Sequence, residues 1–165
     1  MNIVVQRNIG ALIELVRAGA ASTLTAGGAG NNVAVVGSTI DRQNISGSGF
    51  AGQPYGGSMP MSALFGMAFT ATLAAGKALT GALTVNHSPD GATWTPLQTI
   101  TAAQAALSAA GGTVVGQLNF QVSLTSAQRY LQFVWTPNLT ATSIDTASIF
   151  PLLAFGGFDR LPSPN

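Results

Sequence analysis

Hydrophobic and polar residues alternate with a period of two along most of the chain after Leu64, which is the pattern of a β-strand with one buried face. The alternation is clearest at residues 117–124, where Leu118, Phe120 and Val122 are separated by Gln or Asn. Similar stretches occupy residues 65–73, 82–87 and 130–136. Each stretch predicts a strand with one buried and one solvated face.

The same pattern extends to both ends of the chain. Residues 148–155 predict a last strand, in which Pro151 favours an edge or bulged position because proline cannot donate a ladder hydrogen bond. Residues 11–16 and 33–36 are earlier strand candidates. Several short strands with frequent turn signals indicate an all-β protein, an antiparallel sandwich or barrel, and the 165 residues fit a single domain.

Two segments have helical features. Ile9, Leu12, Ile13 and Val16 have helical spacing, but the run is short and β-branched, so a helix and a strand both remain open there. Thr101 with Gln104 resembles a capping box before an alanine-rich stretch, and Gly111 would end a helix. We therefore predict at most one or two short helices in loops, the second within residues 101–112.

Residues 44–60 form a glycine-rich segment with neither the period of a strand nor that of a helix, which predicts a long loop or extended arm. Phe50, Tyr55 and Met59 give this arm apolar anchors, so we expect it to contact a neighbouring subunit. An extended C-terminal tail is expected at about residues 156–165, because two prolines favour extended chain. Within that tail, the candidate interface residues are Phe158, Arg160 and Pro162.

Charge is scarce: the chain has six Lys and Arg, five Asp and Glu, and a formal net charge of +1. Soluble domains usually carry about 25% charged residues, whereas only 7% of this chain is charged. A neutral surface of this kind suits a protein packed against copies of itself or a larger scaffold. Composition therefore points to a structural or assembly role.

No catalytic, metal or cofactor site is expected. His87 is the only histidine, and its neighbour Ser88 would point to the opposite face of a strand, which defeats a hydrolytic triad. Asp90 fits the turn 88–91, where Gly91 would take a positive φ. Asp41 and Asp159 each precede an arginine. The chain has no cysteine, and with one histidine and scattered acids it should hold no metal.

Other partners are disfavoured as well. The cations are spread along the sequence and no phosphate-binding loop is present, so we expect no direct nucleic-acid contact. No apolar run reaches the roughly 18–20 residues that cross a bilayer, so we expect no membrane partner. Arg7, Glu14 and Arg17 interrupt the place of a signal-peptide core, and we expect residues 1–22 to belong to the mature protein.

Three short motifs carry a family resemblance over roughly residues 33–155: GSTIDR at 37–42, a strand ending in the hairpin 88–94, and RYLQF at 129–133. The chain resembles capsid cementing or decoration proteins of tailed bacteriophages and is similar to the Bordetella-phage cementing protein family. The glycine-rich segment 44–60 and the stretch 101–112 depart from that family.

The resemblance implies a jelly-roll β-sandwich on the outside of an icosahedral capsid. There it would cement neighbouring capsomers of a major capsid protein of HK97-like fold, as a dimer or trimer, after assembly in the host cytoplasm. No enzymatic activity is implied. Two alternatives remain open: a carbohydrate-binding or host-recognition sandwich that uses Trp94, Trp135 or Tyr55 as a stacking platform, and a jelly-roll coat protein that forms the shell itself.

Overall fold

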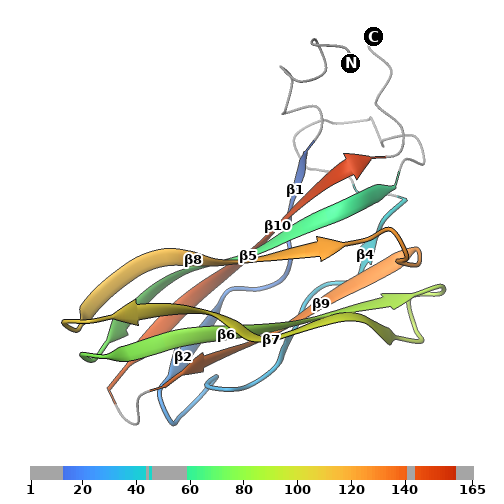
Figure 1. The fold of residues 1–165 in the computed structure, drawn as a ribbon. Coiled ribbons are helices and arrows are strands. Elements are labelled where there is room, and N and C mark those ends of the chain that lie inside the picture. The colour runs from blue at the N-terminus through green and yellow to red at the C-terminus, as the bar shows by residue number, and fades with distance from the viewer. Residues whose placement is uncertain (1–12, 44, 46–58, 141–143, 159–165) are drawn as a thin grey trace, which may run out of the picture.

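The computed structural model describes residues 13–43, 45, 59–140 and 144–158, and this part of the chain is built from β-strands without a helix. Four short strands come first, and six longer strands follow (Figure 1). The short strands are β1 (Glu14–Arg17), β2 (Ser22–Thr25), β3 (Val35–Val36) and β4 (Ile40–Asp41). The long strands are β5 (Pro60–Leu73), β6 (Lys77–Ser88), β7 (Thr95–Ser108), β8 (Gly112–Ser123), β9 (Tyr130–Leu139) and β10 (Thr146–Phe158).

The strands form two antiparallel sheets that pack face to face (Figure 1). In the first, here called the β5 sheet, the order is β1-β10-β5-β8, and β2 also pairs with β10. In the second, the β6 sheet, the order is β3-β9-β6-β7, and β4 also pairs with β9. If β1 with β2 and β3 with β4 are taken as two interrupted strands, each sheet has four strands, and consecutive strands alternate between the sheets as in a jelly roll, except that β6 and β7 form a hairpin within one sheet. The expected all-β sandwich is confirmed.

The core lies between the sheets and is made of the inward positions that the alternation predicts. Leu118, Phe120 and Val122 are buried, whereas Gln117 and Gln121, which point to the opposite face, are exposed. Aromatic rings join the two layers: the ring centroids of Phe65 and Phe133 lie 5.7 Å apart in a stacked pair, and those of Phe65 and Trp135 lie 5.6 Å apart. These are the separations at which aromatic pairs attract one another.

The predicted helix within residues 101–112 is wrong. Residues 95–108 form β7, which pairs with β6 from Lys77↔Ser108 to His87↔Thr95, with register shifts on the way. Alanine has the highest helix propensity, but the free energy of that preference is small. Pairing with the twelve-residue strand β6 outweighs it. Gly111 and Gly112 both have positive φ and reverse the chain between β7 and β8. The two glycines mark a hairpin rather than a helix end.

In the N-terminal stretch, residues 14–17 form a strand, whereas Ile9 and Leu12 lie outside the described residues; the expected edge or bulged position of Pro151 needs correction. β10 is a central strand, paired with β5 on one side and with β1 and β2 on the other. Pro151 lies where its neighbour is interrupted, because Arg17 pairs with Leu152 and Ser22 with Ile149. The carbonyl oxygen of Pro151 faces this gap and accepts from Ala18 N at 3.4 Å. The nitrogen of Pro151, which carries no hydrogen, therefore faces the gap between β1 and β2 and not the edge of the sheet.

Candidate interaction surfaces

One end of the sandwich is organised around the buried side chain of Arg42, which is 2% exposed. Its Nη1 donates to the carbonyl oxygens of Ala127 and, at 3.1 Å, Gln128. Its Nη2 donates to those of Pro60 at 2.6 Å and Leu124 at 2.9 Å. The guanidinium thus ties β4 to the loop between β8 and β9 and to the first residue of β5. Arg42 and Pro60 lie at the two ends of the arm, so the hydrogen bond between them holds these two ends together.

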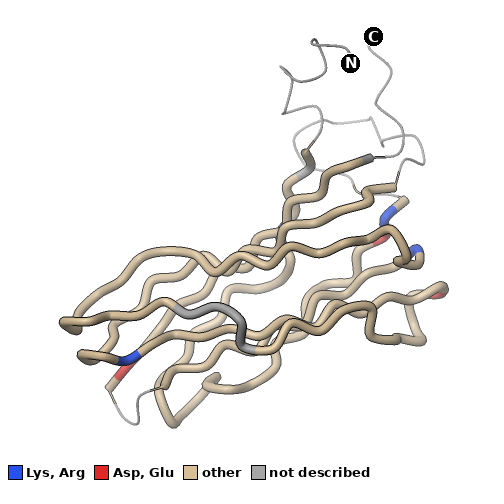
Figure 2. The backbone as a smooth tube through the Cα atoms, viewed as in Figure 1, with Lys and Arg blue, Asp and Glu red and all other residues tan. Residues whose placement is uncertain are grey.

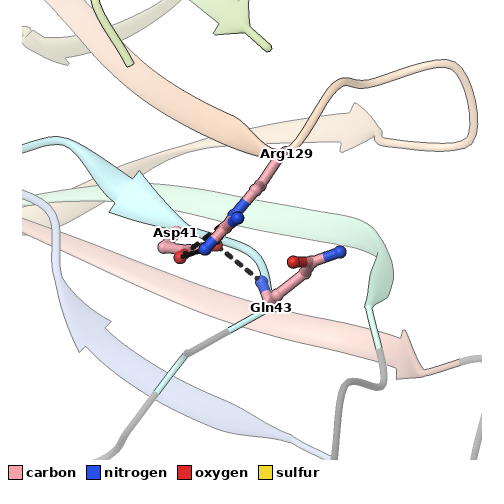
Figure 3. A network of polar contacts seen from close by, with 3 residues as sticks. All are labelled: Asp41, Gln43 and Arg129. Carbon is pink, nitrogen blue, oxygen red and sulfur yellow. Dashed lines mark hydrogen bonds and ion pairs between the residues drawn. The ribbon is translucent and has the colours of Figure 1, made fainter. Parts of the chain in front are cut away.

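Next to Arg42, an ion pair joins β4 to the start of β9 (Figure 3). The carboxylate of Asp41 accepts from Arg129 Nη2 at 2.7 Å and from the backbone N–H of Gln43 at 3.0 Å. The hydrogen bond from Arg129 is the main cause that holds the pKa of Asp41 below its ordinary value. Arg129 also lies over the ring of Tyr130, 4.9 Å from its centroid. Asp41 therefore pairs with Arg129 and not with the adjacent Arg42, whose side chain points inward.

The turn after β6 has the predicted form. Asp90 Oδ1 accepts from the backbone N–H groups of Ala92 at 2.9 Å and Thr93 at 2.8 Å, and from Ser88 Oγ at 2.7 Å. These bonds hold the pKa of Asp90 well below its usual range, with the bond from Thr93 as the largest cause. Gly91 has a φ of 76°. The carboxylate serves the turn, as the sequence indicates.

His87 lies at the end of β6, and its Nδ1 accepts from the backbone N–H of Gln128 at 3.2 Å. This bond gives the imidazole a structural contact with the loop between β8 and β9. In the described part of the chain, no three His, Cys, Asp or Glu residues come together where they could hold a metal ion. No helix there is long and apolar enough to span a membrane.

The two tryptophans proposed as sugar platforms do not form one together. Trp135 is fully buried in the core, against Phe65, so its ring cannot stack on a ligand. Trp94 is half-buried in the turn before β7. Tyr55 lies outside the described residues.

Most of the predicted interface residues also lie outside the described ranges: Phe50, Tyr55, Arg160 and Pro162. Met59 is half-buried immediately before β5. β10 runs to Phe158, so the first residues of the stretch expected as a tail belong to a strand. The backbone of Phe158 pairs with that of Pro60. The base of the tail and the returning base of the arm are therefore neighbours at one end of the sandwich.

A surface that the sequence analysis missed lies on the outer face of the β5 sheet. Leu15, Leu64, Phe150 and Leu152 are 71%, 40%, 52% and 50% exposed and occupy outward positions of β1, β5 and β10. We call these four residues the β5-sheet patch. The signal for it was the almost unbroken apolar run 149–155, since a strand without alternation is usually covered on both faces.

The outer face of the β6 sheet is different. The positions that alternate with buried residues on β6 and β9 are mainly Thr, Asn and Gln. Val36 at the short strand β3 and Leu107 on β7, 60% and 65% exposed, are apolar exceptions. Figure 2 shows charged positions near the two ends of the sandwich. The outward positions of β6 and β9 are thus mainly polar, whereas the β5 sheet exposes the apolar β5-sheet patch.

No protein-family model matches this chain, and no curated protein matches it. Similar solved structures include infectious bursal disease virus Gt strain, with 11% identity, a TM-score of 0.49, and coverage of 92% of this chain and 34% of that one. The PBSX exported protein XepA has 18% identity and a TM-score of 0.41, over 96% of this chain and 41% of that one. Dimeric latent PorU from Porphyromonas gingivalis has 12% identity and a TM-score of 0.39, over 92% and 13%. This chain spans less than half the length of each.

Proposed function

We propose that this chain is a structural virion protein that binds the outer surface of an icosahedral phage capsid and cements neighbouring capsomers. The observation that carries the proposal is the sparsely charged surface of the sandwich, since only 7% of the residues are charged and the formal net charge is +1. A neutral surface of this kind suits a protein packed against a larger scaffold. A shell with hundreds of equivalent seams gains stability from many weak contacts of this kind, and no catalysis is needed.

The geometry of one end of the sandwich supports a role for the arm and the tail in shell binding. Arg42 and the pairing of Phe158 with Pro60 bring the bases of both segments together. Two segments that leave from one rigid end can reach across a seam between capsomers. The proposed contacts are Phe50, Tyr55 and Met59 of the arm and Phe158, Arg160 and Pro162 of the tail. The proposed shell partner, from the family resemblance, is a major capsid protein of HK97-like fold.

A density-gradient separation of particles from the native source tests the role directly. We expect the chain, followed by mass spectrometry, to sediment with particles in a fixed high ratio to a larger coat protein. A chain confined to the light soluble fractions would contradict the proposal. A coat protein that forms the shell itself would be the most abundant protein of the particle, so the ratio separates that alternative.

Substitution of the arm anchors tests the contacts. We expect F50S/Y55S to fold normally and to bind stripped particles at least about tenfold more weakly, because anchoring aromatic residues dominate interface energies. V36S is the control, since it removes an exposed apolar side chain from β3 of the β6 sheet and leaves the arm unchanged. Equal binding by F50S/Y55S and V36S would exclude the arm as the contact.

A further inference from the structure

Gly66, at the centre of β5, is a glycine that the fold itself does not need. A Cβ at this position would meet Asn119 Oδ1 at 3.4 Å and the carbonyl oxygen of Leu152 at 4.0 Å, which are ordinary contacts. Gly37 is the contrast, because a Cβ there would lie 2.6 Å from the carbonyl oxygen of Ala18. A glycine weakens a strand and often marks the close approach of another molecule. Its presence in a central strand therefore points to an object outside this chain.

Around Gly66, large outward side chains of β10 lie beside small ones of β5, and we call these two rows the ridge and the groove. The ridge is Phe150 and Leu152 on β10. The groove is Gly66 and Ala68 on β5, directly beside them, because Leu152 pairs with Gly66 and Phe150 with Ala68. Leu64, also on β5, closes one end of the groove next to Ala154. Large and small side chains therefore alternate between neighbouring strands in three successive rows.

We propose that this face binds the same face of a second copy of the chain, about a two-fold axis that runs parallel to the strands between β5 and β10. Rotation about that axis leaves each row at the same position along the strands. It places the ridge of one copy over the groove of the other. Leu152 then lies over Gly66 of the second copy, and Phe150 over Ala68 of the second copy. The two apolar faces pack as two aligned sheets do, about 10 Å apart.

The outer strands of the sheet fit the same arrangement. The axis places β1 of one copy opposite β8 of the other, so Arg17 faces Asn119 of the second copy, and Leu15 faces Gln121 of the second copy. The amide oxygens of β8 are acceptors for the guanidinium of Arg17. In this arrangement the guanidinium of Arg17 therefore has hydrogen-bond acceptors in the second copy, beside the apolar rows of β5 and β10.

The size of the face also suits a second copy. Four strands about 4.8 Å apart and about 40 Å long cover about 770 Å². A stable interface buries roughly 800 Å² on each partner, so nearly the whole face is required. An identical face would cover this almost uncharged surface in full, which gives the isologous contact of a two-fold dimer.

The test is the oligomeric state of the purified full chain, measured by sedimentation equilibrium without particles. We expect a dimer, weakened at least about tenfold in Kd by F150A, which empties the ridge, and by A68F, which fills the groove. The double variant F150A/A68F exchanges ridge and groove and is expected to recover most of the wild-type Kd, because the two positions face one another across the axis. V36S is the control that should not alter Kd.

A monomeric wild type, or a Kd that F150A and A68F leave unchanged, would overturn the proposal. Additive losses in F150A/A68F would overturn the two-fold geometry. Circular dichroism and thermal unfolding of each variant separate loss of dimer from loss of fold. The inference goes beyond the capsid role, and because no particle enters the test, its failure is distinguishable from failure of that role. A monomer whose particle binding is lost in F150A would assign the face to the shell instead.

Discussion

At the scale of single residues, Arg42 is a buried cation that joins separate segments of the described core. It is 2% exposed and donates to four backbone carbonyl oxygens from two other segments. We expect R42A to lower the free energy of unfolding by about 3 kcal/mol or more, because buried carbonyls lose their donors. R42K should recover little, since one ammonium lacks the planar fork. Urea unfolding measures both, and K77A, which removes an exposed cation at the start of β6, is the control.

The ion pair of Asp41 predicts a dependence on pH and salt. Because the folded-state pKa of Asp41 is lowered, its contribution to stability is present above the ordinary carboxyl pKa of about 4 and is lost as pH falls through the folded value. We expect D41N to be destabilised at neutral pH and to lose less stability than wild type between neutral pH and pH 3. Because the pair is partly exposed, 1 M NaCl should reduce the difference at neutral pH. Equal acid sensitivity of both proteins would contradict this assignment.

At the scale of elements, two glycines in similar sequence settings should respond oppositely to alanine. Gly37 connects β3 to β4, and a Cβ there would press on the carbonyl oxygens of Ala18 and Phe133, so we expect G37A to cost about 1–3 kcal/mol. Gly66 has room in the isolated chain, so G66A should change stability by less than about 1 kcal/mol and can raise it. Thermal unfolding at concentrations that keep the chain monomeric tests the pair. A large loss in G66A would show that the strand itself needs this glycine.

At the scale of the whole molecule, a dimer through the β5 sheet leaves both polar β6 sheets and both arm-bearing ends available. A dimeric cement would then bind two sites on a shell at once. We expect F150A to weaken binding to stripped particles by about 10²-fold or more through lost bivalency, and F150A/A68F to restore it. Particle binding that follows the arm variants but not the dimer variants would show that single chains are the binding unit.

The sequence alone determined which residues face the core in strands with clear alternation, such as β8 and β9, because alternation is a local property that a strand converts directly into two faces. It also determined the turn at Asp90, whose bonds are all made within a few residues. It did not determine β7, since an alanine-rich segment favours a helix until β6 offers a partner. Nor did it show that the side chain of Arg42 is buried while the adjacent Asp41 pairs with Arg129, because the four carbonyls around Arg42 come from segments distant in the chain.

The tertiary structure decided the surface as well. Whether Leu15, Leu64, Phe150 and Leu152 form one patch depends on strand order, which brings β1, β10 and β5 together from opposite ends of the chain. The jelly-roll connectivity likewise arises from pairings such as that of β1 with β10, which no local pattern specifies. Periodicity therefore sets the faces of strands, whereas long-range pairing sets which faces meet, and only the folded chain shows that one sheet keeps an apolar side turned outward.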